Sequence, residues 1–289
     1  MFAVTGATGN LGRLAVESLL RRAPAGGIVA LVRDPARAAD LAAQGVTVRQ
    51  ADYNRPETLP AALAGVTRLL LVSGNEVGQR VRQHQAVIDA AVAARVRLVA
   101  YTSILHADRS EIGLAVEHRA TEELLTESGV PYLLLRNGWY SENYVMAAQG
   151  ALQEGVMIGA TGSGRLSLAS RADYAEGAAA ALIAGETMGG RVLEFAGDEG
   201  LTRQDLCNII GELAGKTVLY QNMSEADYSA AMTQIGLPAP IAAMLAQSDA
   251  AASRGALFDD SHTLSKLLGR PTTPITETLR AVIAQPEPA

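Results

Sequence analysis

Short apolar runs alternate, in the first half of the chain, with segments whose apolar residues are spaced as on one face of a helix. The runs are rich in Val, Leu and Ile and end at Gly, Asp, Ser or Asn, which is typical of buried strands. Six strands are predicted here: Phe2–Thr5, Ile28–Val32, Val46–Gln50, Arg68–Val72, Leu98–Thr102 and Tyr132–Leu135. A seventh, Arg191–Ala196, is predicted to return to the same sheet.

Helices are predicted between these strands from a repeat of three to four residues. One face contains Leu11, Leu14, Ala15, Ser18 and Leu19, and a second contains Val81, Ile88, Ala91 and Val92. Strand and helix in regular alternation predict an α/β protein with a doubly wound parallel sheet, the Rossmann fold, covered on both faces. The crossovers are expected to be right-handed.

The alternation weakens after about residue 140, where the glycine-rich stretch Gly155–Gly164 begins a less regular half. We therefore expect residues 1–150 to form a dinucleotide-binding domain, joined by the returning strand near 191–196. Residues 151–289 are expected to form mainly a smaller C-terminal substrate-binding lobe. Helices are predicted in it at Asp173–Ile183 and at Leu201–Leu213, the latter with Thr202 as N-cap.

Composition narrows the classes of partner. The chain has 289 residues, 48% of them hydrophobic, and a net charge of −6 without any basic block. Nucleic acid and membrane surfaces are therefore not expected as partners. The single cysteine, Cys207, cannot form an intrachain disulfide, and no leader segment or membrane span is apparent. We expect a cytoplasmic protein. The sequence does not decide whether it forms a homo-oligomer.

The strongest motif lies between the first strand and the first helix, where glycines follow the spacing Gly6-x-x-Gly9-x-x-Gly12. The first glycine permits a tight turn, the second lets backbone approach a pyrophosphate, and the third lets helix pack on strand. Free N–H groups at the helix start then bind phosphate. The predicted cofactor-binding residues of this loop are Gly6, Thr8, Gly9, Asn10, Leu11 and Gly12.

The end of the second strand indicates which dinucleotide binds. Arg33 offers a planar fork for the 2′-phosphate of NADPH, whereas an acidic residue at this place accepts from the ribose of NADH. Asp34 follows directly, and it either competes with the phosphate or caps a helix that starts at Pro35. NADPH is the predicted cofactor, with NADH possible.

Two further strand ends are expected to border the cofactor, because ligands of this fold bind outside the carboxyl ends of the strands. Asp52 follows the third strand, near the expected adenine. Ser73, Gly74 and Asn75 follow the fourth, where small residues let the ribose pass. Ordinary turn chemistry also explains both stretches.

The Tyr-x-x-x-Lys pair of common short-chain dehydrogenases is missing. Lys216 and Lys266 are the only lysines, and neither has a tyrosine four residues before it. Leu114 and His118 stand where that pair belongs. A mechanism that protonates an alkoxide through tyrosine is therefore disfavoured, and so is a sugar-nucleotide epimerase.

Several segments together resemble the NmrA-like atypical short-chain dehydrogenases, and among them the bacterial NAD(P)H-dependent quinone reductases. The segments are Thr5–Gly12, Leu31–Pro35, Gln50–Tyr53, Tyr101–Ser103, Leu135–Tyr144, Arg171–Tyr174 and Leu257–Ser261. The run Arg-Asn-Gly-Trp-Tyr-Ser-Glu-Asn is much more specific than the glycine loop. The resemblance adds Thr102 and Ser103 to the expected cofactor contacts. It implies hydride transfer from a nicotinamide to a quinone or similar conjugated acceptor.

The segment after the sixth strand is expected to lie beside the nicotinamide and to supply the acceptor site. Asn137, Tyr144 and His118 are the candidate catalytic residues, as hydrogen-bond or proton donors. The candidate substrate-binding residues are Trp139, Tyr140, Asn143 and Arg171. A core position for Trp139, a merely satisfied histidine at 118 and a surface ion pair at 171 are the competing interpretations. No metal site is predicted, because the histidines lack ligand spacing.

The missing acid fits a quinone acceptor, because its reduction yields a phenolate-type anion whose conjugate acid has a pKa of about 10. Orientation and a modest hydrogen-bond donor then suffice. Two alternatives stay open: a non-catalytic NmrA-like regulator that senses NADP(H), and a reductase of triphenylmethane or azo dyes.

Overall fold

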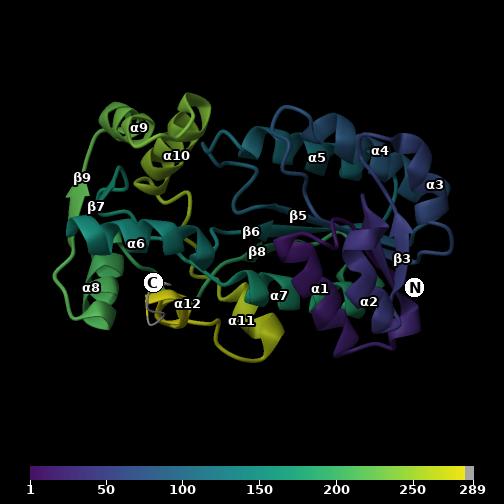
Figure 1. Ribbon diagram of the computed structural model, residues 1–289. Coiled ribbons are helices and arrows are strands. Elements are labelled where there is room, and N and C mark those ends of the chain that lie inside the picture. The colour runs from purple at the N-terminus through teal and green to yellow at the C-terminus, as the bar shows by residue number, and fades with distance from the viewer. Residues whose placement is uncertain (284–289) are drawn as a thin grey trace.

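The computed structural model describes residues 1–283, and a parallel sheet of seven strands runs through the centre of this part of the chain (Figure 1). The strand order is β3-β2-β1-β4-β5-β6-β8. The strands are β1 Phe2–Val4, β2 Ile28–Val32, β3 Thr47–Gln50, β4 Arg68–Leu71, β5 Leu98–Ile104, β6 Tyr132–Asn137 and β8 Val192–Phe195. The predicted doubly wound fold is confirmed, and β8 is the strand that was expected to return to the sheet.

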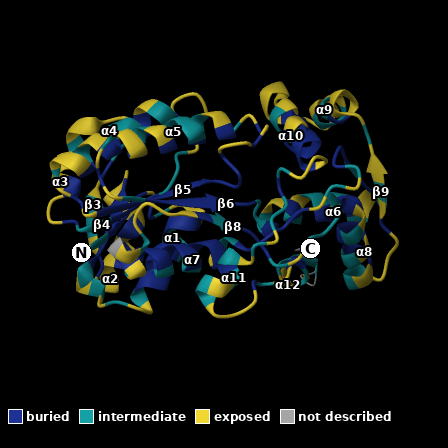
Figure 2. Ribbon diagram, turned by 180° about the vertical axis from the view of Figure 1, so that it is seen from behind, coloured by how far each residue is buried: buried dark blue, intermediate teal, exposed yellow. Residues whose placement is uncertain are grey.

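Helices cover both faces of this sheet, as Figure 2 shows from behind. On one face lie α3 (Leu59–Ala62), α4 (Arg80–Ala93) and α5 (Ala115–Glu127). On the other lie α1 (Asn10–Leu20), α2 (Ala39–Ala43) and α7 (Arg171–Ala184), with α11 (Thr263–Leu268) packed beside α7. The sheet therefore carries two cores, one on each face.

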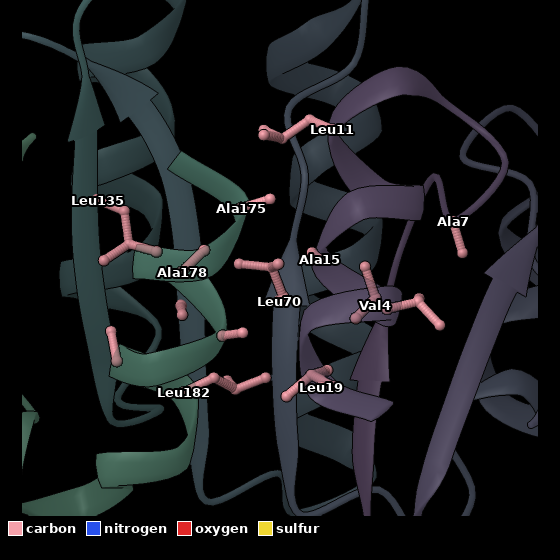
Figure 3. Packing of buried hydrophobic residues seen from close by; sticks show 14 of the residues in the cluster. Val4, Ala7, Leu11, Ala15, Leu19, Leu70, Leu135, Ala175, Ala178 and Leu182 are labelled. Carbon is pink, nitrogen blue, oxygen red and sulfur yellow. The ribbon is translucent and has the colours of Figure 1, made fainter. Parts of the chain in front are cut away.

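Small side chains let α1 and α7 lie close together over β1, β4 and β6 (Figure 3). The contact residues labelled there include Leu11, Ala15 and Leu19 of α1, and Ala175, Ala178 and Leu182 of α7. Leu19 and Leu182 are fully buried, and burial of each such side chain contributes about 1.5–3 kcal/mol. This packing fixes the direction in which the start of α1 points.

The remaining elements gather beyond the β6–β8 side of the sheet (Figure 1). Two short parallel strands, β7 (Val156–Gly159) and β9 (Leu219–Asn222), form a second sheet. The helices here are α6 Val145–Glu154, α8 Arg203–Ala214, α9 Glu225–Gln234, α10 Ala239–Ala252 and α12 Ile275–Ile283. Thr202 caps α8 with a reciprocal bond to Asp205, as its predicted N-cap role requires.

Several local expectations differ from the structure, and one is the fifth strand, which runs to Ile104 and not only to Thr102. The sixth strand extends to Asn137, because Arg136 is neutralised inside the protein and the sheet can continue past it. On α4, Val92 is exposed whereas the polar residues Gln83 and His84 are buried. The buried face of α4 is thus partly polar, a feature that apolar spacing alone does not reveal.

Within residues 1–283, we find no helix whose length and hydropathy would allow it to cross a membrane.

Candidate functional site

The strand order reverses between β1 and β4, where the chain leaves toward β2 on one side and toward β5 on the other. In doubly wound folds this reversal opens a crevice at the carboxyl ends of the strands. The hydroxyl of Thr5 bridges the two strands here, accepting from the Val72 N–H at 2.9 Å and donating to the Leu70 carbonyl at 3.3 Å. The candidate site is built around this edge.

The glycine loop has the shape that its spacing predicts. Gly6 has a positive φ of 58°, and the Gly9 N–H donates to the Gly6 carbonyl at 2.8 Å. A Cβ at Gly12 would lie 2.3 Å from that same carbonyl oxygen, so only glycine fits there. Gly9 is the N-cap of α1 and has no side chain to bond the first-turn N–H groups, which leaves them for an anion.

Arg33 is an exposed cation that directly follows β2, the strand beside β1. Its side chain is 67% exposed, and its guanidinium nitrogen lies 3.8 Å from the Glu76 carboxylate. Asp34 is already engaged, because its carboxylate accepts the Ala36 N–H at 3.0 Å and caps the short helix Pro35–Ala38. The helix-cap interpretation of Asp34 is therefore confirmed, and this carboxylate points back to its own chain.

The other predicted strand ends behave differently from one another. Asp52 lies in a turn of its own chain, with its carboxylate accepting from the Asn54 N–H at 3.0 Å. The loop after β4 is tied to β5, because the Ser73 N–H donates to Thr102 Oγ1 at 2.9 Å. Asn75 is exposed in this loop.

Ser103 faces away from that loop and joins a buried ionic network. Its hydroxyl donates to the Glu122 carboxylate at 2.6 Å, which also receives a two-fold hydrogen bond from Arg136 at 3.0 and 2.7 Å. Arg136 reaches Glu194 of β8 at 2.9 Å as well. These bonds lock α5, β6 and β8 together just below Asn137, and they engage the Ser103 hydroxyl.

Asn137, Tyr140, Asn143 and Arg171 are brought together at the end of β6. The Tyr140 ring packs edge-on against Tyr174 at 5.3 Å, and the Arg171 guanidinium lies 4.9 Å above it. Arg171 also donates to Asn143 Oδ1 at 3.0 Å. Burial raises the pKa of Tyr140, while the neighbouring Asn137 side chain and the Arg171 charge oppose that rise. Tyr140 therefore stays protonated at neutral pH.

Trp139 and Tyr144 belong to the core of the C-terminal elements instead. Trp139 is partly buried against that core, and Tyr144 is 4% exposed within it. Arg203 of α8 lies 4.8 Å above the Tyr144 ring, and burial raises the pKa of this phenol well above its usual range. The structure thus separates the two tyrosines that the sequence places four residues apart.

His118 is buried below the site. Its Nδ1 lies 2.8 Å from the Tyr101 hydroxyl, and burial lowers its pKa to about 3. The imidazole is neutral at physiological pH, so it has no extra proton to give to a substrate. The interpretation of His118 as a satisfied buried side chain fits this geometry better than that of a proton donor.

Sequence reasoning missed Arg80 and His84, which hold the backbone of Gly74 from α4. A signal was available for His84, because it precedes Ile88 by four residues and so lies on the buried face of the predicted helix. Its partners Gly74 and Thr121 lie on other elements, and the sequence pattern does not indicate these contacts.

The comparison with protein families identifies the chain. The model of the NmrA-like family matches residues 1–273. The chain belongs to the NmrA-like family. This agrees with the resemblance carried by the glycine loop and the Arg136–Asn143 run.

Relatives of this NmrA-like chain include two curated reductases. It is 56% identical over 279 residues to Quinone oxidoreductase 2 of Escherichia coli (strain K12), across 96% of this chain and 97% of that one. It is 30% identical over 285 residues to the NAD(P)H azoreductase of Xenophilus azovorans, across 97% of each.

Two solved structures are similar over almost their whole length. The NADPH complex of the NADPH-dependent quinone oxidoreductase QOR2 of Escherichia coli has a TM-score of 0.95 and 54% identity, and the match covers 98% of this chain and 99% of that chain. The triphenylmethane reductase of Citrobacter sp., complexed with NADP(H), has a TM-score of 0.92 and 35% identity, with 98% and 100% covered.

Two of the buried histidines, His84 and His118, predict an acid-sensitive fold. Burial lowers the pKa of His84 to about 4 and that of His118 to about 3, whereas both titrate at about 6.5 in the unfolded chain. Between these values only the unfolded chain binds the protons, so each histidine removes about 1.4 kcal/mol of stability per pH unit as the pH falls below about 6.5.

Urea unfolding between pH 7 and pH 5 measures this dependence. The variant His84→Gln has no titrating group at this position, so its stability is expected to fall less steeply than that of the parent chain over the same interval. An identical slope in both proteins would contradict the assignment of this proton linkage to His84.

Proposed function

We propose that this protein is an NADPH-dependent oxidoreductase that reduces quinones or similar conjugated acceptors. The observation that carries the proposal is its similarity to the quinone oxidoreductase of Escherichia coli over nearly the full length of both chains. The local geometry supports it independently, because the site combines an anion-binding helix start with an exposed arginine and an aromatic acceptor region.

The residues present fit NADPH. The first turn of α1 offers uncapped N–H groups for the pyrophosphate, and Gly9, at the N-cap, has no side chain to cover them. The missing Cβ of Gly12 lets this turn lie close to the Gly6 carbonyl. Arg33 would bind the 2′-phosphate, since Asp34 is engaged in its cap. The loop Ser73–Asn75 would border the ribose next to the nicotinamide. When bound, NADPH supplies the hydride.

The acceptor would lie against the group formed by Asn137, Tyr140, Asn143 and Arg171. The Tyr140 phenol would donate its proton toward a quinone oxygen, and the neighbouring Asn137 side chain opposes the rise in its pKa. The Arg171 guanidinium above the ring makes that proton a better donor. A developing quinol anion has a conjugate acid of pKa about 10, so a hydrogen bond of this kind is enough and water completes the protonation.

Dye reduction is a second candidate activity at the same site. It is favoured by the similarity to an azoreductase and to a triphenylmethane reductase, which cover nearly the whole chain. Dyes and quinones share a flat conjugated body with a carbon or nitrogen that accepts hydride.

We also propose a cytoplasmic location, where NADPH is available and a lone cysteine stays reduced.

The first test is NADPH oxidation by the purified protein with 1,4-benzoquinone, after subtraction of the uncatalysed reaction. We expect a rate proportional to protein concentration and lower with NADH. Tight cofactor binding without turnover on quinones or dyes would instead favour the NADP(H)-sensing regulator.

The preference for NADPH is predicted to depend on Arg33. Loss of its charged hydrogen bonds in Arg33→Ala should raise KM for NADPH about 10- to 100-fold and leave KM for NADH unchanged. Arg21→Ala is a matched control, because it removes an exposed arginine at the C-terminal end of α1, away from the proposed phosphate-binding turn. Equal KM changes for the two cofactors in Arg33→Ala would remove the 2′-phosphate assignment.

Of the two candidate tyrosines, Tyr140 is predicted to serve the acceptor. Tyr140→Phe should lower kcat/KM for benzoquinone about tenfold, with KM for NADPH unchanged, because one hydrogen bond to the developing anion is lost. Tyr144→Phe should stay within about twofold of the parent, since its hydroxyl lies in the core beside Arg203. The reverse ranking of the two variants would transfer the role to Tyr144.

A further inference from the structure

Residues 73–79, the loop between β4 and α4, contain no regular secondary structure apart from turns and bends, yet side chains hold their backbone. The Gly74 N–H donates to His84 Nε2 at 2.9 Å, and the Gly74 carbonyl accepts from Arg80 Nε at 2.5 Å. His84 follows Arg80 by four residues, so both lie on one face of α4. Two side chains of one helix thus form hydrogen bonds with the N–H and the carbonyl of the same glycine.

The hydrogen bond to Gly74 also fixes the state of the His84 ring. A backbone N–H can only donate, so Nε2 must be unprotonated and the ring proton must lie on Nδ1. From there it is donated to Thr121 Oγ1 at 2.9 Å, and the Thr121 hydroxyl donates to the Glu117 carbonyl at 2.9 Å. His84 and Thr121 are both completely buried. A directed chain of hydrogen bonds therefore runs from Gly74 into α5.

Arg80 forms the second arm of this arrangement. Its Nη1 and the Glu117 Oε2 are both buried, lie 3.8 Å apart and have no hydrogen-bond partner among the described residues. The other carboxylate oxygen of Glu117 accepts the Gly78 N–H at 2.9 Å. The starts of α4 and α5 thus hold the loop at Gly74 and again at Gly78.

The loop held in this way lies against the cofactor-binding elements. The Val72 N–H, directly before it, is bonded to Thr5 next to the glycine loop, and a Cβ placed on Gly6 would lie 3.9 Å from the Val72 side chain. At the other end of the loop, Glu76 lies 3.8 Å from Arg33. The loop therefore extends between the phosphate-binding turn and the arginine assigned to the 2′-phosphate.

We propose that Arg80 and His84 clamp the Gly74 peptide and act as positioning residues for NADPH, with Thr121 fixing the orientation of the His84 ring. The clamp keeps the loop in one conformation before the cofactor arrives, so that binding does not have to order it. This inference rests on the proposed function, in which Ser73–Asn75 border the cofactor.

The test measures the dissociation constant of NADPH by fluorescence titration, together with KM for NADPH, KM for benzoquinone and kcat. His84→Leu leaves the Gly74 N–H without an acceptor, and we expect about tenfold weaker NADPH binding with KM for benzoquinone unchanged. His84→Gln places an amide oxygen near the former Nε2 and should restore binding to within about threefold of the parent.

Two further variants keep the experiment decisive. Thr121→Val is nearly isosteric and removes the bond to the ring together with the hydroxyl's bond to the Glu117 carbonyl within α5, so about threefold weaker NADPH binding is expected even if His84→Leu does not fold. Ile88→Ala weakens the packing of the same helix one turn away, without touching the loop, and should leave the NADPH dissociation constant unchanged.

The proposal is overturned if His84→Leu and Thr121→Val bind NADPH as tightly as the parent. It is also overturned if Ile88→Ala weakens NADPH binding as much as His84→Leu does. Failure of the parent chain itself to bind NADPH would refute the proposed function, and the clamp with it. Normal NADPH binding by the parent without turnover of quinones would refute the reductase activity alone, because the clamp is measured by binding.

Discussion

At Gly12 the first turn of α1 passes so close to the Gly6 carbonyl that a Cβ atom would lie 2.3 Å from it. This approach sets where the helix begins and aims its free N–H groups at the carboxyl edge of the sheet. The Ala- and Leu-lined contact between α1 and α7 holds the helix in that direction (Figure 3). The proposed binding of a dinucleotide phosphate at this loop is thus a property of backbone position, supported by ordinary hydrophobic packing.

Polar groups, by contrast, organise the opposite face of the sheet. The Arg136–Glu122 ion pair is buried, and removal of one partner would lower the free energy of unfolding by several kcal/mol. The hydrogen bond between His84 and Thr121 is buried too, and loss of one partner there would cost about 1–3 kcal/mol. Each pair joins elements that meet at the crevice. We interpret these costs as the reason that the loop after β4 and the end of β6 have fixed positions.

The sequence predicts most of the fold, because buried parallel strands are short apolar runs and the glycine spacing has few alternatives. It also offers the cap at Asp34 as one of two interpretations, since capping depends only on near neighbours, and the structure decides for the cap. It does not predict that Tyr140 packs against Tyr174 and Arg171 while Tyr144 enters the core of the C-terminal elements, because a tertiary contact with Arg203 decides this. The role of His84 is hidden for the same reason: its partners Gly74 and Thr121 lie on other elements.

The chain leaves the central sheet at Asn137 and re-enters it at Val192, on the neighbouring parallel strand. Because the two strands are parallel, the intervening residues must return from the carboxyl edge of the sheet to its amino edge, and α7 makes this crossing against α1. Insertions, deletions and substitutions before α7, in residues 138–170, can reshape the proposed acceptor site while the contact between α1 and α7 stays as it is. In an architecture of this kind, the acceptor site can change while the binding site of the hydride donor stays the same.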